Sequence, residues 1–286
     1  MAVGTATGPR EREVRCGLRY RDAHPDRGVG RGRCVLGGTL SDYESLLWEQ
    51  DGHVASVTLN RPEKKNAMSG TMFEEIKATF DRASLDPEVR CLVISGAGGS
   101  FCSGADLTDP ANMVTSPFEL KDRMRKVHDV AQAVLTCSVP TIAKVTGVAA
   151  GAGCNLALGM DLVVASTEAS FAELFIKRGL VVDFGGSWVL TRLLPLTKAK
   201  ELALLGDAIS AAEADRLGII NRLCAPDEVD SVTAELAARL VAVPPRTASM
   251  IKENLNRATD GGLSDSLDME SLTQALCFAS DDTKEA

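Results

Sequence analysis

Short apolar runs alternate with segments of helical periodicity from residue 43 onward. Six of the runs are short and rich in β-branched residues, which favours strands over helices; they cover residues 46–50, 54–59, 89–95, 142–146, 162–166 and 219–224. Asp51-Gly52 joins the first two runs, and this dipeptide is typical of a hairpin turn. Helical spacing is found from 69 (where Ser69 is the expected N-cap), at 118–136, from 188, at 198–205 and at 211–217. This alternation predicts an α/β fold.

The two ends of the chain follow different patterns. After Pro226 the spacing is helical, with breaks at Pro244-Pro245 and Gly261-Gly262. Residues 1–40 are rich in Arg and Gly and lack a hydrophobic face, which predicts a disordered leader. A start codon assigned too early would give such a leader; a mitochondrial transit peptide is the functional alternative, against which four acidic residues argue. The predicted division is therefore a leader at 1–40, a core at 41–225 and a helical region at 226–286.

The charge is unevenly distributed along the chain. Residues 1–40 hold eight Arg and four Asp/Glu, a net charge of +4. Because the whole chain has a net charge of −8, residues 41–286 carry −12. An acidic body argues against binding to nucleic acid or to a membrane surface, so an anionic ligand has to be held by local groups. No apolar run in the sequence reaches the roughly 18 residues of a membrane span, and there is no signal-peptide pattern.

Cysteine and histidine usage argues against a metal site. The eight cysteines include no CxxC pair, and the only histidines are His24, His53 and His128. The cysteines are expected to be reduced and mostly buried, which is typical of a cytoplasmic protein.

Two turns made mainly of glycine and alanine are the strongest candidates for chemistry. Each follows an expected strand and is expected to feed a helix; they lie at 96–107 and 147–153. Such residues leave backbone N–H groups uncovered, and two converging N–H groups are the minimum for an oxyanion hole. A tightly packed strand–helix crossover is the alternative for either turn alone. The sequence lacks the G-x-G-x-x-G, G-x-x-x-x-G-K-[ST] and G-x-S-x-G signatures, so nucleotide phosphates and a serine nucleophile are disfavoured.

The chain resembles the crotonase (enoyl-CoA hydratase/isomerase) superfamily over roughly residues 43–286. The motifs that carry the resemblance are Asn60-Arg-Pro with Asn66-Ala67, Gly96-Ala-Gly with Phe101-Cys-Ser-Gly-Ala-Asp-Leu107, Gly147-Val-Ala-Ala-Gly-Ala-Gly-Cys154, Gly185-Gly-Ser187, and Ala208-Ile-Ser-Ala with Gly218-Ile-Ile220. The resemblance implies a spiral of ββα turns, acyl-CoA thioesters as substrates, and no cofactor other than the CoA of the substrate. It also implies that residues 226–286 serve oligomerisation, giving a homotrimer or a dimer of trimers. In that family a further helix, beyond the region equivalent to 280–286, helps to cover the CoA.

The resemblance also implies the site residues. The oxyanion-hole donors match the N–H groups of Ala105 and Ala152. The loop from Glu63 to Ala67 lies along the CoA in the family, so Lys64 and Lys65 are candidates for its phosphates, with a solvated loop as the alternative. The further expected substrate-binding residues are Ala67, Ser103, Gly104, Asp106, Leu107, Gly151, Asn155 and Phe175; Asp106 is also expected to cap a turn.

The acids of the hydratases are missing from their expected positions. Hydration uses two glutamates that position one water, and these positions are Asn155 and Phe175 here. Neither an amide nor a phenyl ring can act as a general base or acid. Glu173 lies two residues from the second position and would reach it only through an alignment gap. Hydratase activity is therefore the alternative rather than the main prediction.

Asp183 is the expected acid–base residue. Leu180-Val-Val-Asp-Phe-Gly-Gly-Ser-Trp188 is similar to the Leu-x-Pro-Asp-x-Gly-Gly-Thr-Trp pattern of the aspartate-type isomerases, with Val182 in place of the proline. Its apolar neighbours Val181, Val182 and Phe184 are expected to desolvate the carboxylate and raise its pKa. The alternative role is an N-cap for the helix after Gly186. These residues predict an isomerase that moves an enoyl-CoA double bond from β,γ to α,β; a non-catalytic acyl-CoA-binding protein is a further alternative.

Four other residues are expected to have structural roles. His128 is expected on a solvated or interface face of its helix, and Cys102 and Cys154 are expected to be packing residues. Asp161 is expected to cap the turn before the following strand.

Overall fold

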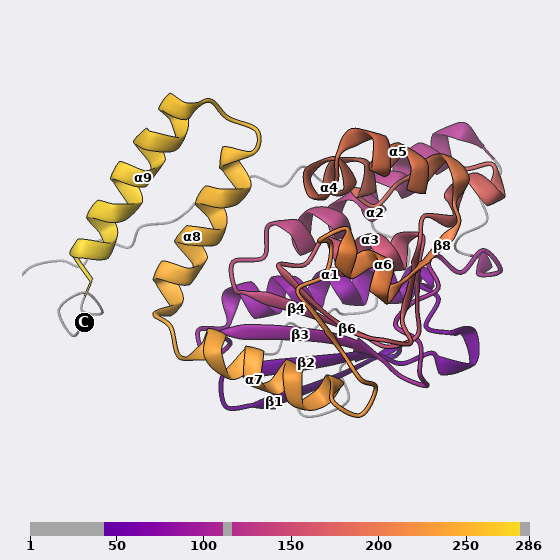
Figure 1. The fold of residues 1–286 in the computed structure, drawn as a ribbon, viewed down its shortest axis with the longest axis horizontal. Coiled ribbons are helices and arrows are strands. Elements are labelled where there is room, and N and C mark those ends of the chain that lie inside the picture. Colours follow the sequence, from indigo (N-terminus) through magenta and orange to yellow (C-terminus); the bar gives the residue numbers. More distant parts are fainter. Residues whose placement is uncertain (1–42, 111–115, 281–286) are drawn as a thin grey trace, which may run out of the picture. The chain divides into compact units, whose positions relative to one another are not determined.

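The strands of the computed structural model, which describes residues 43–110 and 116–280, form two sheets (Figure 1). The larger sheet has six strands in the order β1-β2-β3-β4-β6-β9, with β1 and β2 antiparallel and the remaining neighbours parallel. Its strands are β1 Leu46–Asp51, β2 Val54–Leu59, β3 Cys91–Gly96, β4 Thr141–Val145, β6 Leu162–Ser166 and β9 Arg222–Cys224. All six strands and the hairpin turn predicted from the sequence are confirmed, although β9 begins three residues later than expected.

A second layer of short strands runs beside the first. β5 Val148–Ala150, β7 Ser170–Ala172 and β8 Ala208–Ser210 form a three-stranded sheet. Two isolated parallel bridges, Met68 with Ala105 and Cys102 with Ala149, continue this layer in the earlier part of the chain. The chain thus repeatedly places a long strand in one sheet, a short strand in the second layer and then a helix, which confirms the expected spiral of ββα turns.

Helices cover both faces of the six-stranded sheet. Alternate residues of β3 point to opposite faces, so Leu92 and Ile94 join the core beneath α1, α2 and α3, while Cys91 and Val93 pack with α7. The helices are α1 Gly70–Leu85, α2 Pro117–Leu135, α3 Ala152–Leu158 and α7 Val229–Val241. The Ser69 hydroxyl caps α1 as predicted, since it accepts a hydrogen bond from Met72 N at 3.1 Å.

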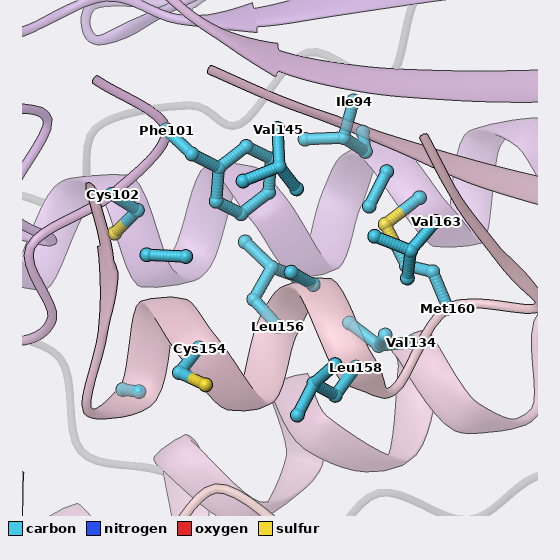
Figure 2. Close-up of a cluster of buried hydrophobic side chains, with 14 of the residues drawn as sticks. Ile94, Phe101, Cys102, Val134, Val145, Cys154, Leu156, Leu158, Met160 and Val163 are labelled. Atoms are coloured by element: carbon cyan, nitrogen blue, oxygen red, sulfur yellow. The ribbon is translucent and has the colours of Figure 1, made fainter. Parts of the chain in front are cut away.

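The short helix α3 lies at the centre of the core. Its residues from Ala152 to Leu158 are all buried. Figure 2 shows Leu156 pointing from α3 toward Phe101 and Val145, and all three side chains are fully buried. Packing of this helix therefore fixes the position of the turn that precedes it.

The remaining helices complete the turns and the C-terminal region. They are η1 Pro62–Lys64, η3 Leu174–Arg178, α4 Gly186–Leu193, α5 Leu196–Leu205, α6 Ala211–Arg216, α8 Pro245–Ala258 and α9 Leu263–Phe278. The predicted breaks at 244–245 and 261–262 separate α7, α8 and α9. Figure 1 shows α8 and α9 as an antiparallel pair, and neither helix contains a buried residue. Within residues 43–110 and 116–280, the helices are too short or too polar to span a membrane.

Three sequence predictions need correction or lie outside the described residues. The 147–153 segment is not a simple turn, because β5 occupies 148–150. The 96–107 turn does not feed a helix directly, since α2 begins only at Pro117. The predicted leader at 1–40 lies outside the described residues, and the boundaries at 41–225 and 226–286 stay predictions.

We expect Leu156→Ala to lower the free energy of unfolding by about 3 kcal/mol, because a fully buried leucine leaves a cavity. The matched control is Leu85→Ala at the end of α1, where the side chain is 82% exposed and the expected loss is about 0.5 kcal/mol. Urea denaturation of the two variants measures the difference, and equal losses would contradict the central position of α3.

Candidate active site

The two expected oxyanion-hole amides lie on adjacent turns of the spiral. The bridge between Met68 and Ala105 uses the Gly104 carbonyl and the Asp106 N–H, at 2.8 and 2.9 Å from Met68, so the Ala105 N–H points away from that strand. Ala152 is the first residue of α3, and its N–H has no partner within the helix. Among the described backbone carbonyls, none accepts a hydrogen bond from either N–H. Both amides are therefore available to a carbonyl oxygen.

Glycines allow these turns to come close to one another. A Cβ added to Gly104 would lie 2.9 Å from the Ala150 oxygen and 3.6 Å from the Ala152 nitrogen, and Gly104 has φ +98°. A Cβ on Gly147 would lie 2.1 Å from the Gly99 oxygen. The glycines of these turns were predicted to leave room for a ligand. In the structure they allow one backbone turn to approach the next.

The loop expected to lie along the CoA is held by a hydrogen-bonded asparagine. Lys65 and Asn66 both have positive φ values, 51° and 55°, which are unfavourable for residues other than glycine. The buried Asn66 amide offsets this cost by donating to the Ala97 and Ser100 oxygens, each at 2.8 Å, and by accepting from Arg61 N at 2.9 Å. The conformation of the loop is therefore fixed by contacts to the 96–107 turn.

A buried ion pair joins the same loop to the residue after Ala105. Arg61 donates to the Ala67 oxygen at 2.6 Å and to Asp106 Oδ2 at 2.9 Å, and Asp106 is 6% exposed. Asp106 Oδ1 accepts from both the hydroxyl and the N–H of Thr108, as expected for a turn cap. The Thr108 hydrogen bonds and Arg61 lower the pKa of Asp106 to about 2, against the opposing effect of burial. Asp106 is therefore a charged structural group that fixes the loop.

The other residues expected along the CoA lie close to this loop. Ser103 donates through its N–H to the Lys65 oxygen at 3.0 Å and through its hydroxyl to the Lys64 oxygen at 3.1 Å. Both lysines are exposed, and Lys64 Nζ lies 3.4 Å from the Thr108 hydroxyl. Leu107 is also exposed. Their roles in CoA binding stay predictions.

Asn155 is a residue of α3, and Phe175 lies near the start of the same helix. The Phe175 ring is close to Gly151, since a Cβ added there would be 3.8 Å from the ring. The buried Asn155 amide donates to the backbone oxygen of Asp183 at 2.9 Å and lies 3.4 Å from Glu173 Oε2. Asn155 therefore links the helix that begins at Ala152 to the loop that carries Asp183.

Asp183 is a half-buried carboxyl group in the loop before α4. Its Oδ1 is buried and has no hydrogen-bond partner among the described residues. Burial raises the pKa of Asp183 to about 6, and the charges of His128 and Arg123 from α2 act in the opposite direction. The predicted alternative, an N-cap role, is wrong: Gly185 is the N-cap of α4, and no side chain caps that helix.

The desolvation of Asp183 comes from only part of the expected surroundings. Val181 is 83% exposed and cannot shield the carboxylate. Phe184 is buried, has φ +52° and packs against Phe73 with ring centroids 6.1 Å apart. A bulky residue in the left-handed region is strained, so core packing holds the loop in this conformation.

Glu173 is the buried acid that sequence reasoning did not select. Its side chain is 2% exposed, and its Oε1 has no hydrogen-bond partner among the described residues. Burial raises the pKa of Glu173 to about 7; hydrogen bonds from Cys154 and Asn155 lower it, and the charge of Asp183 raises it. The signal in the sequence was an acid next to a short strand, two residues from an expected catalytic position.

A cavity of about 650 Å³ lies between α2, α4 and α8, beside the Asp183 loop. His128 and Gly185 line it on the side of that loop, and Lys252 and Asn256 line it from α8. Neither Ala105 nor Ala152 is among its lining residues.

The structure also shows the surroundings of the four residues that were expected to have structural roles. His128 is exposed, as predicted. Cys102 and Cys154 are buried, as predicted; burial raises the pKa of Cys102 to about 12 and that of Cys154 well above its usual value. Asp161 does not merely cap its own turn, because its carboxylate accepts from Thr141 N at 2.8 Å and from Lys252 Nζ at 2.7 Å. Asp161 thus joins the start of β4 to α8.

The spiral of ββα turns defines the fold class of this protein, and the two amides on adjacent turns have no backbone partner among the described residues. Residues 49–286 match the enoyl-CoA hydratase/isomerase family model, so the chain belongs to that family and is an acyl-CoA enzyme.

Named relatives fall on both sides of the hydratase–isomerase division. The chain is 34% identical to a 1,2-epoxyphenylacetyl-CoA isomerase of Escherichia coli, over 85% of this chain and 93% of the relative. It is similar to an enoyl-CoA hydratase structure from Polaromonas, with a TM-score of 0.76, 34% identity and coverage of 80% and 90% of the two chains. A Thermobifida fusca enoyl-CoA hydratase homologue, solved in complex with CoA, has a TM-score of 0.77, 32% identity and coverage of 85% and 95%.

We expect Gly104→Ala to reduce turnover of an enoyl-CoA thioester by about 10²-fold, the effect of losing one oxyanion donor. The added methyl group would push against the Ala150 oxygen and displace the neighbouring Ala105 and Ala152 amides. Gly99→Ala is the matched control, because Gly99 also has a positive φ (+75°) but nothing within 4 Å of its added Cβ. Steady-state kinetics of both variants measure the effect, and equal losses would show that backbone strain alone is responsible.

Proposed function

We propose that this protein is an enoyl-CoA isomerase in which Asp183 moves the proton. The observation that carries the proposal is the Asp183 carboxyl group: partly desolvated, with one oxygen unpaired, in a loop tied to the helix that begins at Ala152. A carboxylate in such surroundings is a stronger base than an exposed one.

The proposed reaction transfers a single proton within the substrate. Asp183 removes the proton from C2 of a 3-enoyl thioester, and the electron pair moves to the thioester oxygen to form a dienolate. The Ala105 and Ala152 amides stabilise the negative charge on that oxygen. The protonated Asp183 then returns the proton to C4, and the double bond forms between C2 and C3. No oxidant, reductant or cofactor beyond the CoA of the substrate is required.

The relatives support a CoA thioester as the substrate, and one of them is named as an isomerase. Hydratase activity needs a second acid that shares a water with the first. Asn155 and Phe175 supply no such acid, and Glu173 faces Cys154 and apolar side chains. The site therefore supports isomerisation better than hydration.

We also propose that the protein acts as a homotrimer or dimer of trimers in the cytoplasm. Apolar side chains on α8 and α9, including Ile251, Leu255, Leu267 and Phe278, are more than half exposed, which favours burial against another subunit. The six cysteines in the described part of the chain are free, as expected in a reducing compartment.

We expect Asp183→Asn to lower isomerisation of a 3-enoyl-CoA by about 10³-fold, since an amide cannot accept the proton. Appearance of the conjugated thioester absorbance measures the reaction. Asp129→Asn, on the exposed surface of α2, is the matched control and should leave the rate unchanged.

Undiminished isomerisation by Asp183→Asn would contradict the mechanism, and hydration of crotonyl-CoA that survives this substitution would identify a hydratase. CoA-thioester binding without turnover in the wild type would identify a non-catalytic binding protein.

We expect kcat/KM to rise with pH through about 6 and then level off, because Asp183 must be ionised to act as the base. The acidic limb should therefore lie above the range of an ordinary aspartate. Phosphate groups titrate near pH ~6 as well, so the profile should be repeated with a pantetheine thioester that lacks the 3′-phosphate of CoA. A limb near pH ~4 with that substrate would exclude a desolvated Asp183 as the base.

A further inference from the structure

Three buried side-chain oxygens without a partner among the described residues belong to Asp183 and to two residues linked to it by hydrogen bonds. They are Asn155 Oδ1, Glu173 Oε1 and Asp183 Oδ1, and none has a hydrogen-bond partner among the described residues. Buried polar atoms are usually paired, so a group of unpaired oxygens indicates a site whose protons matter. The proposed function uses only the oxygen of Asp183.

We propose that Glu173 is a positioning residue, whose carboxyl group holds the Asn155 amide in the orientation that fixes the backbone of Asp183. This inference rests on the proposed role of Asp183. The Asn155 Nδ2 atom is shared between Glu173 Oε2 at 3.4 Å and the Asp183 carbonyl oxygen at 2.9 Å. Glu173 is therefore connected to the reacting carboxyl group through one side chain.

The Asn155 side chain has little room to adopt another orientation. A Cβ added to Gly186 would lie 2.3 Å from Asn155 Nδ2 and 2.5 Å from its Oδ1, so α4 packs directly on the amide. The Gly186 N–H in turn donates to the Asp183 oxygen at 2.9 Å. Two donors, one from α3 and one from α4, thus hold the same carbonyl group.

The Glu173 side chain is enclosed by uncharged residues. Its side chain borders a cavity of about 10 Å³ whose other lining residues are uncharged: Cys154, Leu158, Phe171, Ala172, Leu190, Leu202, Ile209 and Ile219. A carboxyl group in this position has no route to the substrate, so Glu173 acts through Asn155. This separates its role from that of Asp183.

The two carboxyl groups are also coupled electrostatically. The charged and titratable groups that act on Glu173 are Cys154 from α3 and Asp183, and those that act on Asp183 from α2 are Arg123 and His128. Asp183 has the lower pKa of the pair, so it ionises first, while Glu173 is still protonated, and its charge then raises the pKa of Glu173. Replacing Glu173 with a neutral residue should therefore leave the ionisation of Asp183 nearly unchanged, which separates a loss of positioning from a change in charge.

The test compares Glu173→Leu, which removes the acceptor, with Glu173→Gln, which retains one. In Glu173→Leu we expect kcat for a 3-enoyl-CoA to fall by about 10²-fold with little change in KM, because the base is displaced. Hydrogen exchange of the amides at 183–189 should become faster in the same variant. Glu173→Gln should retain most of kcat, with the acidic limb of its pH profile close to that of the wild type, because Asp183 ionises before Glu173. Glu168→Leu and Glu168→Gln, at an exposed position, are the matched controls.

Each outcome decides the proposal. Unchanged kcat and exchange in a folded Glu173→Leu variant would overturn it. If Glu173→Leu does not fold, Glu173→Met, which also lacks a carboxyl acceptor, takes its place: unchanged kcat and exchange in that variant would overturn the proposal, and a reduced kcat with faster exchange would support it. If the wild type does not isomerise 3-enoyl-CoA, the proposed function fails, and the exchange rates at 183–189 alone then decide whether Glu173 positions the loop.

Discussion

Hydrogen bonds between the short second strands of successive spiral turns are the constraint on which the site depends. Cys102 N donates to the Val148 oxygen and Ala150 N to the Cys102 oxygen, both at 2.9 Å, while Gly151 N donates to the Ala172 oxygen at 2.8 Å. These bonds place consecutive turns at strand spacing, about 4.8 Å apart, which leaves no room for side chains between them. The Ala105 and Ala152 amides are adjacent as a result. Their placement depends on backbone pairing, so it is independent of the side chains that carry the proton chemistry.

Burial and hydrogen-bond partners, rather than residue type, divide the acids of this region into different roles. Asp106 is buried but accepts hydrogen bonds from Thr108 and is paired with Arg61, so its pKa is lowered to about 2 and it remains charged. Asp183 is partly buried, one of its oxygens has no partner within the described part of the chain, and its pKa is raised to about 6. Glu173 is buried against apolar side chains, and its pKa is raised to about 7. The first is suited to hold a loop, the second to exchange a proton near neutral pH, and the third is only partly ionised at neutral pH.

The sequence was sufficient to predict what depends on local pattern. The Asp51-Gly52 hairpin, the Ser69 cap and the strand positions follow from periodicity and turn chemistry, and the structure confirms them. The three-residue strands β5, β7 and β8 were missed, because so few residues cannot display a two-residue period. The contact between Arg61 and Asp106 spans 45 residues, and that between Asn155 and Glu173 spans 18. Long-range contacts of this kind leave no pattern in a single sequence, so the link from Glu173 through Asn155 to the Asp183 loop could not be predicted.

Asn155 occupies the position of a catalytic glutamate of the hydratases, but in this chain its side chain holds a loop. A glutamate there would have to face a water molecule, whereas the amide donates to the Asp183 backbone and lies against Gly186. The isomerase-type pattern has a proline at the position of Val182, which would restrict the backbone of this loop directly. Here the loop is instead held by the Asn155 amide, by the Gly186 N–H and by Phe184, which is buried against Phe73. In this chain, the amide at the position of the hydratase acid therefore also supplies a restraint on the Asp183 loop that the loop sequence itself lacks.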